Sequence, residues 1–322
     1  MAQTDSMQTK TVLVVGASGT LGAVIAKTLL ARGVRVRAMV RATSNCAKLQ
    51  ALGVTDYVVA NLMDPASLER ALTAQPRADA VISSAAGFTA HSRLTKEDNS
   101  QTNTEGYRNL VDAAKSADIP RFIMISILEC DKAAEVPHFR QKFLAEQYLA
   151  EKRQPYLALR AGAFLDRSYD VVAKKVKHGI FPDVVPGVAM GMIYTPDLAR
   201  YAIEAALDVP ASALNQSVDV CCDVPATGPM VAAAFTRALG RSVVAKPAFS
   251  PLVRMAMPLI SRRVPSLRDG ISVLAWLRKG GYVSHDQETQ RKLFGTLPTI
   301  EDSVKRYCQD HGLLKSSSLR IS

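Results

Sequence analysis

Short apolar runs alternate with longer amphipathic stretches over the first 165 residues of the chain. Several of these runs are apolar almost throughout, which is typical of strands that are covered on both faces. We expect strands over residues 11–17, 34–40, 54–60, 79–85, 121–126 and 156–162. We expect helices between them over residues 20–31, 65–74, 101–117 and 138–152. Strand–helix alternation of this length predicts an α/β fold with a Rossmann-type, doubly wound parallel sheet.

The pattern loosens after residue 166. There we expect a helix, a strand and a second helix over residues 195–207, 216–222 and 228–240. Thr195 is the expected N-cap of the first helix, and a glycine ends the second. A Met- and Leu-rich stretch at 251–277 carries the only tryptophan. This stretch is either the packed face of a smaller lobe, or a substrate lid or hydrophobic docking surface. The residues after 166 together predict a smaller, mostly helical C-terminal lobe.

These patterns divide the chain into four parts. We expect a flexible N-terminal tail, a nucleotide-binding Rossmann domain, a substrate lobe interleaved with the Rossmann core, and a C-terminal tail. Their predicted boundaries are residues 1–10, 11–165, 166–314 and 315–322.

The charge of the chain bears on its partners. The formal net charge is +11, with the excess of basic residues after residue 240. Such an excess can attract nucleic acid, an anionic membrane surface or an acidic protein. Aromatic residues are sparse and no nucleic-acid-binding signature is present, so we expect no nucleic acid as a partner. A weak contact of the basic C-terminal part with a membrane surface or an acidic partner stays open.

Other features exclude further classes of protein. The first ten residues contain no apolar signal segment, and no apolar run approaches the ~18 residues that span a bilayer. We therefore expect a cytoplasmic protein. The five cysteines and five histidines are scattered without metal-ligand spacing, which predicts no metal site.

The segment VVGASGTLG carries the strongest chemical signal. A predicted strand runs into Gly16, and Gly19 and Gly22 follow at the start of a helix. Glycines allow a tight turn and a close approach to a pyrophosphate, while the helix N-terminus presents free N–H groups to it. The spacing is G-x-x-G-x-x-G. We assign the contacts with the diphosphate to Gly16, Ser18, Gly19, Thr20, Leu21 and Gly22.

The end of the second predicted strand selects the dinucleotide. An NAD site usually places an acidic residue there to accept the ribose hydroxyls. This chain reads RVRAMVRATS at that point, with Arg41 where the acid would lie, Thr43 and Ser44 beside it, and Arg37 in reserve. A guanidinium pairs with a 2′-phosphate, so the sequence favours NADP(H).

At this point the chain resembles a known family, the atypical and extended short-chain dehydrogenases, and within them the NmrA-like and isoflavone-reductase-like branch. The resemblance rests on GASGTLG, NLMDPASL, SSAAG, NTEGYRNLVDAAKSADIPRFIMIS and KFLAEQYL, and it covers about the first 165 residues. It implies that Leu62 and Asp64 border the adenine and that Ala85, Ala86 and Gly87 lie along the cofactor. It also implies that Ser126 lies near the nicotinamide and that Lys142 binds its ribose. For Asn103, structural and functional roles stay open.

The resemblance also exposes a departure. Typical branches carry Tyr-x-x-x-Lys, in which the tyrosine donates a proton, whereas this chain has His138 four residues before Lys142. A histidine titrates near neutral pH and could donate a proton as hydride arrives. Some branches lack the tyrosine, and there lysine, water or substrate handles the proton. The role of His138 therefore stays open.

Two functions follow from this reasoning. The first is an NADPH-dependent reductase that transfers hydride to a C=C, C=O or C=N group of an apolar, aromatic or quinonoid small molecule. Its catalytic residues would be Lys142, His138 and Ser126. Its substrate would contact Phe164, Met190, Met192 and Trp276 of the second lobe. The alternative is a non-catalytic NADP(H)-binding redox sensor, regulator or assembly factor, which the missing tyrosine favours.

Overall fold

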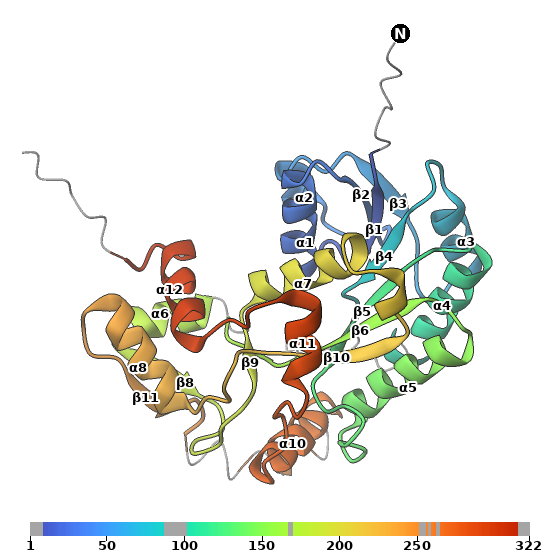
Figure 1. The fold of residues 1–322 in the computed structure, drawn as a ribbon. Coiled ribbons are helices and arrows are strands. Elements are labelled where there is room, and N and C mark those ends of the chain that lie inside the picture. The colour runs from blue at the N-terminus through green and yellow to red at the C-terminus, as the bar shows by residue number, and fades with distance from the viewer. Residues whose placement is uncertain are drawn as a thin grey trace, which may run out of the picture. The chain divides into compact units, whose positions relative to one another are not determined.

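The computed structural model describes residues 9–86, 102–166, 170–250, 256, 259–261 and 265–314. The chain divides into two compact units, and each is assembled from segments that are distant in the sequence (Figure 1). Unit 1 takes Met1–Asp131, His138–Arg160 and Pro196–Val218, and unit 2 takes Lys132–Pro137, Ala161–Thr195 and Asp219–Ser322. The predicted boundary near residue 165 stays a prediction. Of the predicted N-terminal tail, the structure describes only residues 9 and 10. The predicted C-terminal tail, residues 315–322, lies outside the described residues.

A seven-stranded sheet forms the centre of unit 1. Its strands are β1 (Thr11–Val15), β2 (Arg35–Val40), β3 (Asp56–Val59), β4 (Ala80–Ser83), β5 (Phe122–Ile127), β6 (Tyr156–Ala161) and β10 (Gln216–Val220). The strand order is β10-β6-β5-β4-β1-β2-β3. The pairs β1–β2, β2–β3, β1–β4 and β4–β5 are all parallel. The predicted Rossmann-type fold is therefore confirmed.

Helices connect these strands on both faces of the sheet. They are α1 (Thr20–Ala31), α2 (Ala47–Ala51), α3 (Pro65–Thr73), α4 (Tyr107–Ser116), α5 (Pro137–Glu151) and α7 (Thr195–Leu207). The helix predicted over residues 101–117 begins instead with a π-helical turn, Thr102–Gly106, which leads into α4. No helix in the described parts of the chain is long and apolar enough to cross a membrane.

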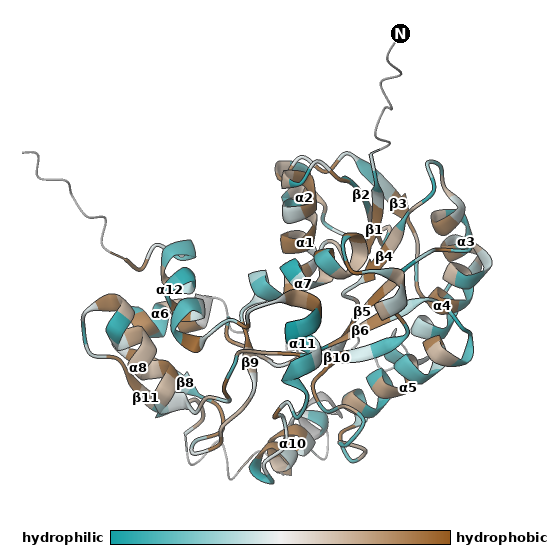
Figure 2. Ribbon diagram, in the orientation of Figure 1, coloured by the Kyte–Doolittle hydropathy of each residue, from teal (hydrophilic) through white to brown (hydrophobic). Residues whose placement is uncertain are grey.

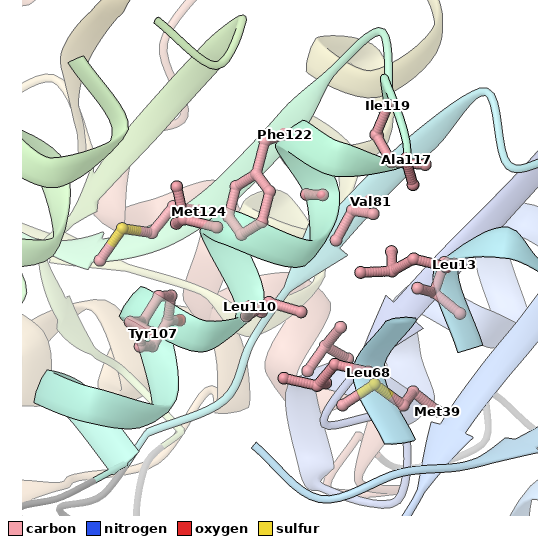
Figure 3. Close-up of a cluster of buried hydrophobic side chains, with 14 of the residues drawn as sticks. Leu13, Met39, Leu68, Val81, Tyr107, Leu110, Ala117, Ile119, Phe122 and Met124 are labelled. Atoms are coloured by element: carbon pink, nitrogen blue, oxygen red, sulfur yellow. The ribbon is translucent and has the colours of Figure 1, made fainter. Parts of the chain in front are cut away.

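One hydrophobic core cluster of unit 1 lies between the sheet and helices α3, α4 and α5. Figure 3 shows how side chains from strands and from two helices meet there: Leu13, Val81, Phe122 and Met124 from strands, Leu68 from α3, and Tyr107 and Leu110 from α4. All of these side chains are buried. The same strands are brown along most of their length in Figure 2, as expected for strands covered on both faces. This core fixes the phenol ring of Tyr107.

Unit 2 contains short strands and helices. Its strands form two parallel pairs, β7 (Ala163–Phe164) with β9 (Met192–Ile193) and β8 (Ile180–Asp183) with β11 (Val244–Pro247). Its helices include α6 (Asp170–Lys177), α8 (Gly228–Leu239), α10 (Pro265–Arg278), α11 (Gln287–Phe294) and α12 (Ile300–Asp310). Gly240 ends α8 with a φ of 62°, as its predicted C-cap role requires.

Thr195 differs from the prediction. It is the first residue of α7, and its hydroxyl donates to the carboxylate of Asp166 at 2.6 Å. Burial raises the pKa of Asp166, against the lowering effect of the hydrogen bond from Thr195. The Thr195 hydroxyl thus provides a hydrogen bond to the buried carboxyl group of Asp166.

Candidate functional site

The order of the strands locates the candidate site. The chain fills the sheet outward from β1 to β3 and then returns to the other side of β1 with β4. In open parallel sheets, ligands bind at the carboxyl ends of the strands where the order reverses in this way. That point lies between β1 and β4, where the glycine-rich turn follows β1.

The glycines of this turn are needed for close backbone contacts. Gly16 has a φ of +79°, and a Cβ there would lie 2.9 Å from the hydroxyl oxygen of Ser84. A Cβ on Gly22 would lie 2.2 Å from the carbonyl oxygen of Gly16. The N–H of Gly19 donates to that same carbonyl at 3.0 Å. Side chains at Gly16 and Gly22 are therefore excluded, because they would push the turn away from β4 and from α1.

Within the described parts of the chain, no side chain caps the N–H donors at the N-terminus of α1. Gly19 is its N-cap, with an extended backbone and no side-chain hydrogen bond to the helix, and the first turn contains no acidic residue. Ser18 and Gly19 are exposed, while Thr20 and Leu21 are half-buried. Unpaired N–H groups and the positive end of the helix dipole attract an anion. The residues present fit a diphosphate at this point.

Arg41 follows directly after β2 and is exposed. Its backbone N–H donates to the Ser44 hydroxyl at 3.0 Å, and the Ser44 N–H donates to the Arg41 carbonyl at 2.9 Å. These two bonds fix a tight turn from which the guanidinium extends. That guanidinium has no hydrogen bond or ion pair within the described parts of the chain, so it is available for an anionic ligand.

Arg37 cannot serve as the reserve phosphate ligand. Its side chain is buried, and its guanidinium donates to the carbonyls of Ala74, Gln75 and Pro76 at 2.8–2.9 Å. It also pairs with Asp56 at 3.2 Å. The sequence expectation for Arg37 was wrong because a buried guanidinium needs fixed partners, and the loop after α3 supplies them.

The segment after β3 contains the two residues predicted to border the adenine. The Asp64 carboxylate caps α3 by accepting the N–H of Ser67 at 3.3 Å, and Asp64 is exposed. The Leu62 carbonyl accepts from the Asn109 side chain at 2.9 Å, and the Leu62 side chain packs against the core. These contacts hold the segment in place, while the predicted contact with adenine stays a prediction.

Lys142 is joined to the end of β4 and to α4. Its Nζ donates to the Ala85 carbonyl at 2.8 Å and to the Tyr107 hydroxyl at 3.0 Å. The lysine side chain is buried, and its ammonium lies 4.3 Å from the centre of the Tyr107 ring. Ala85 directly follows Ser84, the residue that a Cβ on Gly16 would strike. The structure thus brings the predicted glycine turn, Ala85 and Lys142 together.

Fewer contacts are known for the other residues predicted to lie near Lys142 and the end of β4. His138 is buried one turn before Lys142 on α5, and its ring stands edge-on to that of Phe139 at 4.7 Å. Ala86 is exposed, and Gly87 lies outside the described residues. The amide of Asn103 donates to the side-chain oxygen of Gln141 at 3.4 Å, which links the π-helical turn to α5.

Ser126 belongs to a different cluster. Its hydroxyl is buried and donates to the Glu146 carboxylate, which also binds the guanidinium of Arg160 at 2.7 Å. The Ser217 hydroxyl and the Cys130 thiol donate to the same carboxylate at 2.8 and 3.3 Å. The predicted contact of Ser126 with a substrate stays a prediction, and its observed partner is Glu146.

Sequence reasoning missed Tyr107 and the pair of Glu146 and Arg160. A signal for the pair was present, because Arg160 is the one charged residue in the apolar strand YLALRA and a buried charge needs a partner. Glu146 lies four residues after Lys142, which places it on the same side of α5. No comparable signal marked Tyr107, since an aromatic residue in a helix usually packs in a core.

The four residues predicted to contact a substrate belong to unit 2. Phe164 is half-buried in β7, and Met190 and Met192 are buried around β9. Trp276 is buried in α10, with its ring edge-on to that of Tyr282 at 6.1 Å between centres. Their contact with a substrate stays a prediction.

Comparison with known families identifies one match over most of the chain. The model of the NmrA-like family matches residues 8–258. This stretch includes the glycine turn, Arg41, Ala85 and Lys142.

Curated relatives match the chain over a shorter stretch. The photosystem II assembly factor Ycf39 of Cyanophora paradoxa is 34% identical over 154 residues, which are 48% of this chain and 45% of that protein. Ycf39 of Synechocystis is 32% identical over 154 residues with the same coverage. The chain thus spans about half the length of the curated relatives it matches.

Solved structures share the fold over nearly the whole chain. The NADPH-dependent quinone oxidoreductase QOR2 of Escherichia coli, solved with NADPH, is 23% identical with a TM-score of 0.69, covering 92% of this chain and 99% of that one. The triphenylmethane reductase of Citrobacter sp., solved with NADP(H), is 19% identical with a TM-score of 0.69 and the same coverage. At these identities the likeness concerns the fold.

Proposed function

The chain belongs to the NmrA-like family, and from that premise we propose that it is an NADPH-dependent reductase of a small apolar molecule. The observation that carries the proposal is the junction of the glycine turn with Lys142 through Ser84 and Ala85. This junction places the N–H groups at the start of α1, which can bind an anion, and the buried ammonium of Lys142 in the same unit of the protein. A dinucleotide needs both, because its diphosphate and its nicotinamide ribose lie some distance apart.

The residues of unit 1 fit NADP(H) at three points. The N–H groups at the start of α1 would hold the diphosphate, since Gly19 supplies no side-chain cap and the first turn of the helix contains no acidic residue. Arg41 would pair with the 2′-phosphate. An ammonium has three N–H donors, and two of those of Lys142 are accepted by the Ala85 carbonyl and the Tyr107 hydroxyl. Lys142 would donate to the ribose hydroxyls with the third. The structures of QOR2 and of the triphenylmethane reductase, solved with this cofactor, support the assignment.

The cofactor, when bound, supplies the hydride. The protein would orient the nicotinamide through Lys142, whose position is fixed by Ala85 and Tyr107. His138, one turn earlier on α5, is our candidate to hold a proton for the reduced atom. For Ser126 we retain only a supporting role, because its hydroxyl donates to Glu146. The proposed substrate is an apolar aromatic or quinonoid molecule reduced at a C=C, C=O or C=N group, a class to which quinones and triphenylmethane dyes belong.

A second candidate function is an NADP(H)-binding assembly factor or regulator without turnover. The likeness to Ycf39, at 34% identity, favours it. The histidine in place of tyrosine at position 138 favours it as well, since a regulator has no need of a proton donor. Both functions require the same nucleotide site, so they differ only in whether hydride leaves the cofactor.

Turnover separates the two functions. We expect the purified protein to oxidise NADPH anaerobically when supplied with a panel of quinones and triphenylmethane dyes, as followed by the absorbance of the reduced nicotinamide. His138→Phe keeps a ring at that position without a titratable group and should lower the rate without changing the affinity for NADPH. Tight binding of NADPH without oxidation by any acceptor would favour the regulator, and failure to bind NADPH would contradict both functions.

A further inference from the structure

The hydroxyl that is absent at position 138 has a counterpart on another helix. We propose that Tyr107 of α4 is a positioning residue for Lys142, so that this chain keeps a tyrosine–lysine pair built from two helices. The inference rests on the proposed function, because Lys142 matters there as the ligand of the nicotinamide ribose. It adds a residue that neither the motif nor its spacing identifies.

Three contacts fix the Tyr107 hydroxyl. It accepts from Lys142 Nζ at 3.0 Å and from the Ser83 hydroxyl at 3.0 Å, and it donates to the Ala85 carbonyl at 2.9 Å. A phenol hydroxyl has one donor and two acceptor positions, so its capacity is filled. Tyr107 is 0% exposed. It therefore cannot touch a substrate itself, and any effect on the site passes through its partners.

The ring of Tyr107 gives this hydroxyl a fixed position. The ring belongs to the core cluster that includes Leu110, Phe122 and Met124 (Figure 3). The ammonium of Lys142 lies 4.3 Å from the ring centre, within the range of a cation–π contact. The lysine is thus held by a ring face, by the hydroxyl and by the Ala85 carbonyl at once.

This arrangement makes Lys142 ready to bind before the cofactor arrives. A lysine side chain is long and flexible, and fixing it on binding would weaken the affinity for the ligand. Tyr107 and Ala85 confine the ammonium beside the end of β4, the same strand end that contacts the glycine turn. Removal of the Tyr107 hydroxyl would release one of the two hydrogen bonds that confine the lysine. We therefore expect the affinity for NADPH to depend on that hydroxyl only while Lys142 is present.

A double-mutant cycle tests this dependence. Calorimetric titration with NADPH would be run on the full chain, on Tyr107→Phe, on Lys142→Met and on the double variant. Phenylalanine keeps the ring in the core and removes only the hydroxyl. We expect Tyr107→Phe to weaken binding roughly tenfold in the natural background, the effect of one lost hydrogen bond to a charged group. In the Lys142→Met background the same change should alter binding less than about twofold.

Tyr148 provides a matched control on the same pair of helices. It lies on α5, its hydroxyl donates to Asp112 of α4 at 2.9 Å, and the Lys152 ammonium lies 5.0 Å from its ring. Tyr148→Phe removes a similar contact away from the glycine turn, so it should leave NADPH binding unchanged. Equal losses from Tyr107→Phe in both backgrounds, or no loss in either, would overturn the inference.

A second readout does not need the cofactor. The ammonium of a confined lysine gives a slowly exchanging nitrogen–proton signal by NMR, and the signal of Lys142 is identified by its loss in Lys142→Met. We expect Tyr107→Phe to broaden or remove this signal, while the backbone amide spectrum remains that of a folded protein. An unchanged signal would overturn the inference. If the natural protein fails to bind NADPH while this signal behaves as expected, the proposed function fails and the positioning of Lys142 by Tyr107 stands.

Discussion

Lys142 and Glu146 lie one turn apart on α5, and both are buried, yet their surroundings differ in one respect. The Glu146 carboxylate is enclosed by four donors, from Arg160, Ser126, Ser217 and Cys130. The Lys142 ammonium donates to a carbonyl and a phenol, and within the described parts of the chain one of its three donors has no acceptor. We call the first the closed cluster and the second the open cluster.

The electrostatics of the closed cluster agree with a structural role. Burial alone would lower the pKa of Arg160, but the hydrogen bond and the charge of Glu146 outweigh it and raise that pKa. Burial, and then the charge of Glu146, raise the pKa of the Cys130 thiol. The Arg160 guanidinium therefore stays charged and the Cys130 thiol stays neutral. Arg160 also pairs with Asp131 at 3.0 Å, which links the turn after β5 to β6.

The difference indicates how a buried charge serves stability in one place and binding in another. A buried charge whose hydrogen bonds are all filled holds elements together, and removing one partner leaves the other uncompensated. A buried charge with a donor to spare can receive a ligand. The following predictions test this contrast through variants in which only stability, or only binding, should change.

The largest effect is expected from Glu146→Gln. The variant keeps the size of the side chain but leaves the Arg160 charge without its closest partner, so we expect unfolding to become easier by about 3 kcal/mol. Denaturant titration measures this change, and the folded protein should bind NADPH as the natural protein does. Glu151→Gln, at the exposed end of the same helix, should change stability by less than about 0.5 kcal/mol. Equal stability of the two variants would contradict a closed cluster.

Arg41→Ala should change selectivity between cofactors. We expect NADPH to bind roughly 10–100-fold more weakly, because hydrogen bonds between charged groups are lost, while NADH binding changes little. Calorimetry with both nucleotides measures the ratio. Arg35→Ala serves as the control, since Arg35 lies at the other end of β2 and pairs with Asp56 at 2.9 Å. Similar losses of affinity for NADPH and NADH would contradict the assignment of Arg41 to the 2′-phosphate.

Lys142→Met should show the reverse of Glu146→Gln. We expect NADPH to bind about tenfold more weakly, while the free energy of unfolding changes by less than about 1 kcal/mol. The reason is that no carboxylate within the described residues loses a partner when the ammonium is removed. Denaturant titration and calorimetry on one preparation give both values. Lys152→Met, which breaks an exposed pair with Asp112, should leave NADPH binding unchanged. A large loss of stability in Lys142→Met would place this lysine with the closed cluster.

The smallest effect concerns the Cys130 thiol. Because the pKa of this thiol is raised, it stays protonated as the pH rises through the range in which an ordinary cysteine ionises. We expect thiol-specific reagents to leave Cys130 unlabelled in the native protein, while the partly exposed Cys46 reacts. Peptide mapping after labelling at several pH values measures this difference. Rapid labelling of Cys130 in the folded protein would show that the cluster opens.

The framework of unit 1 could be predicted from sequence, because its elements are set by local pattern. The helix expected over residues 20–31 is α1, and the six strands expected before residue 165 all occur, with ends shifted by one or two residues. The glycine turn was predictable for the same reason, since only glycine tolerates its contacts.

The contacts between elements were not predictable in the same way. Strands β7 and β9 contain two residues each, too few to show a period, and they form only because each supplies a partner for the other. Tyr107 and Lys142 are separated by 35 residues, and their contact depends on how α4 and α5 pack against the same core. A charged residue inside an apolar strand, such as Arg37 or Arg160, indicates that a partner exists without saying which one.

The central claim is that unit 1 binds a 2′-phosphorylated dinucleotide. Calorimetric titration of the purified protein with NADPH, NADP⁺, NADH and NAD⁺ tests it most directly. The account predicts that the 2′-phosphorylated pair binds far more tightly than the other two, with NADPH at least as tight as NADP⁺. A clear preference for NADP⁺ over NADPH would favour a sensor. Binding of none of the four, or tighter binding of NADH and NAD⁺, would contradict the site from Gly16 to Lys142.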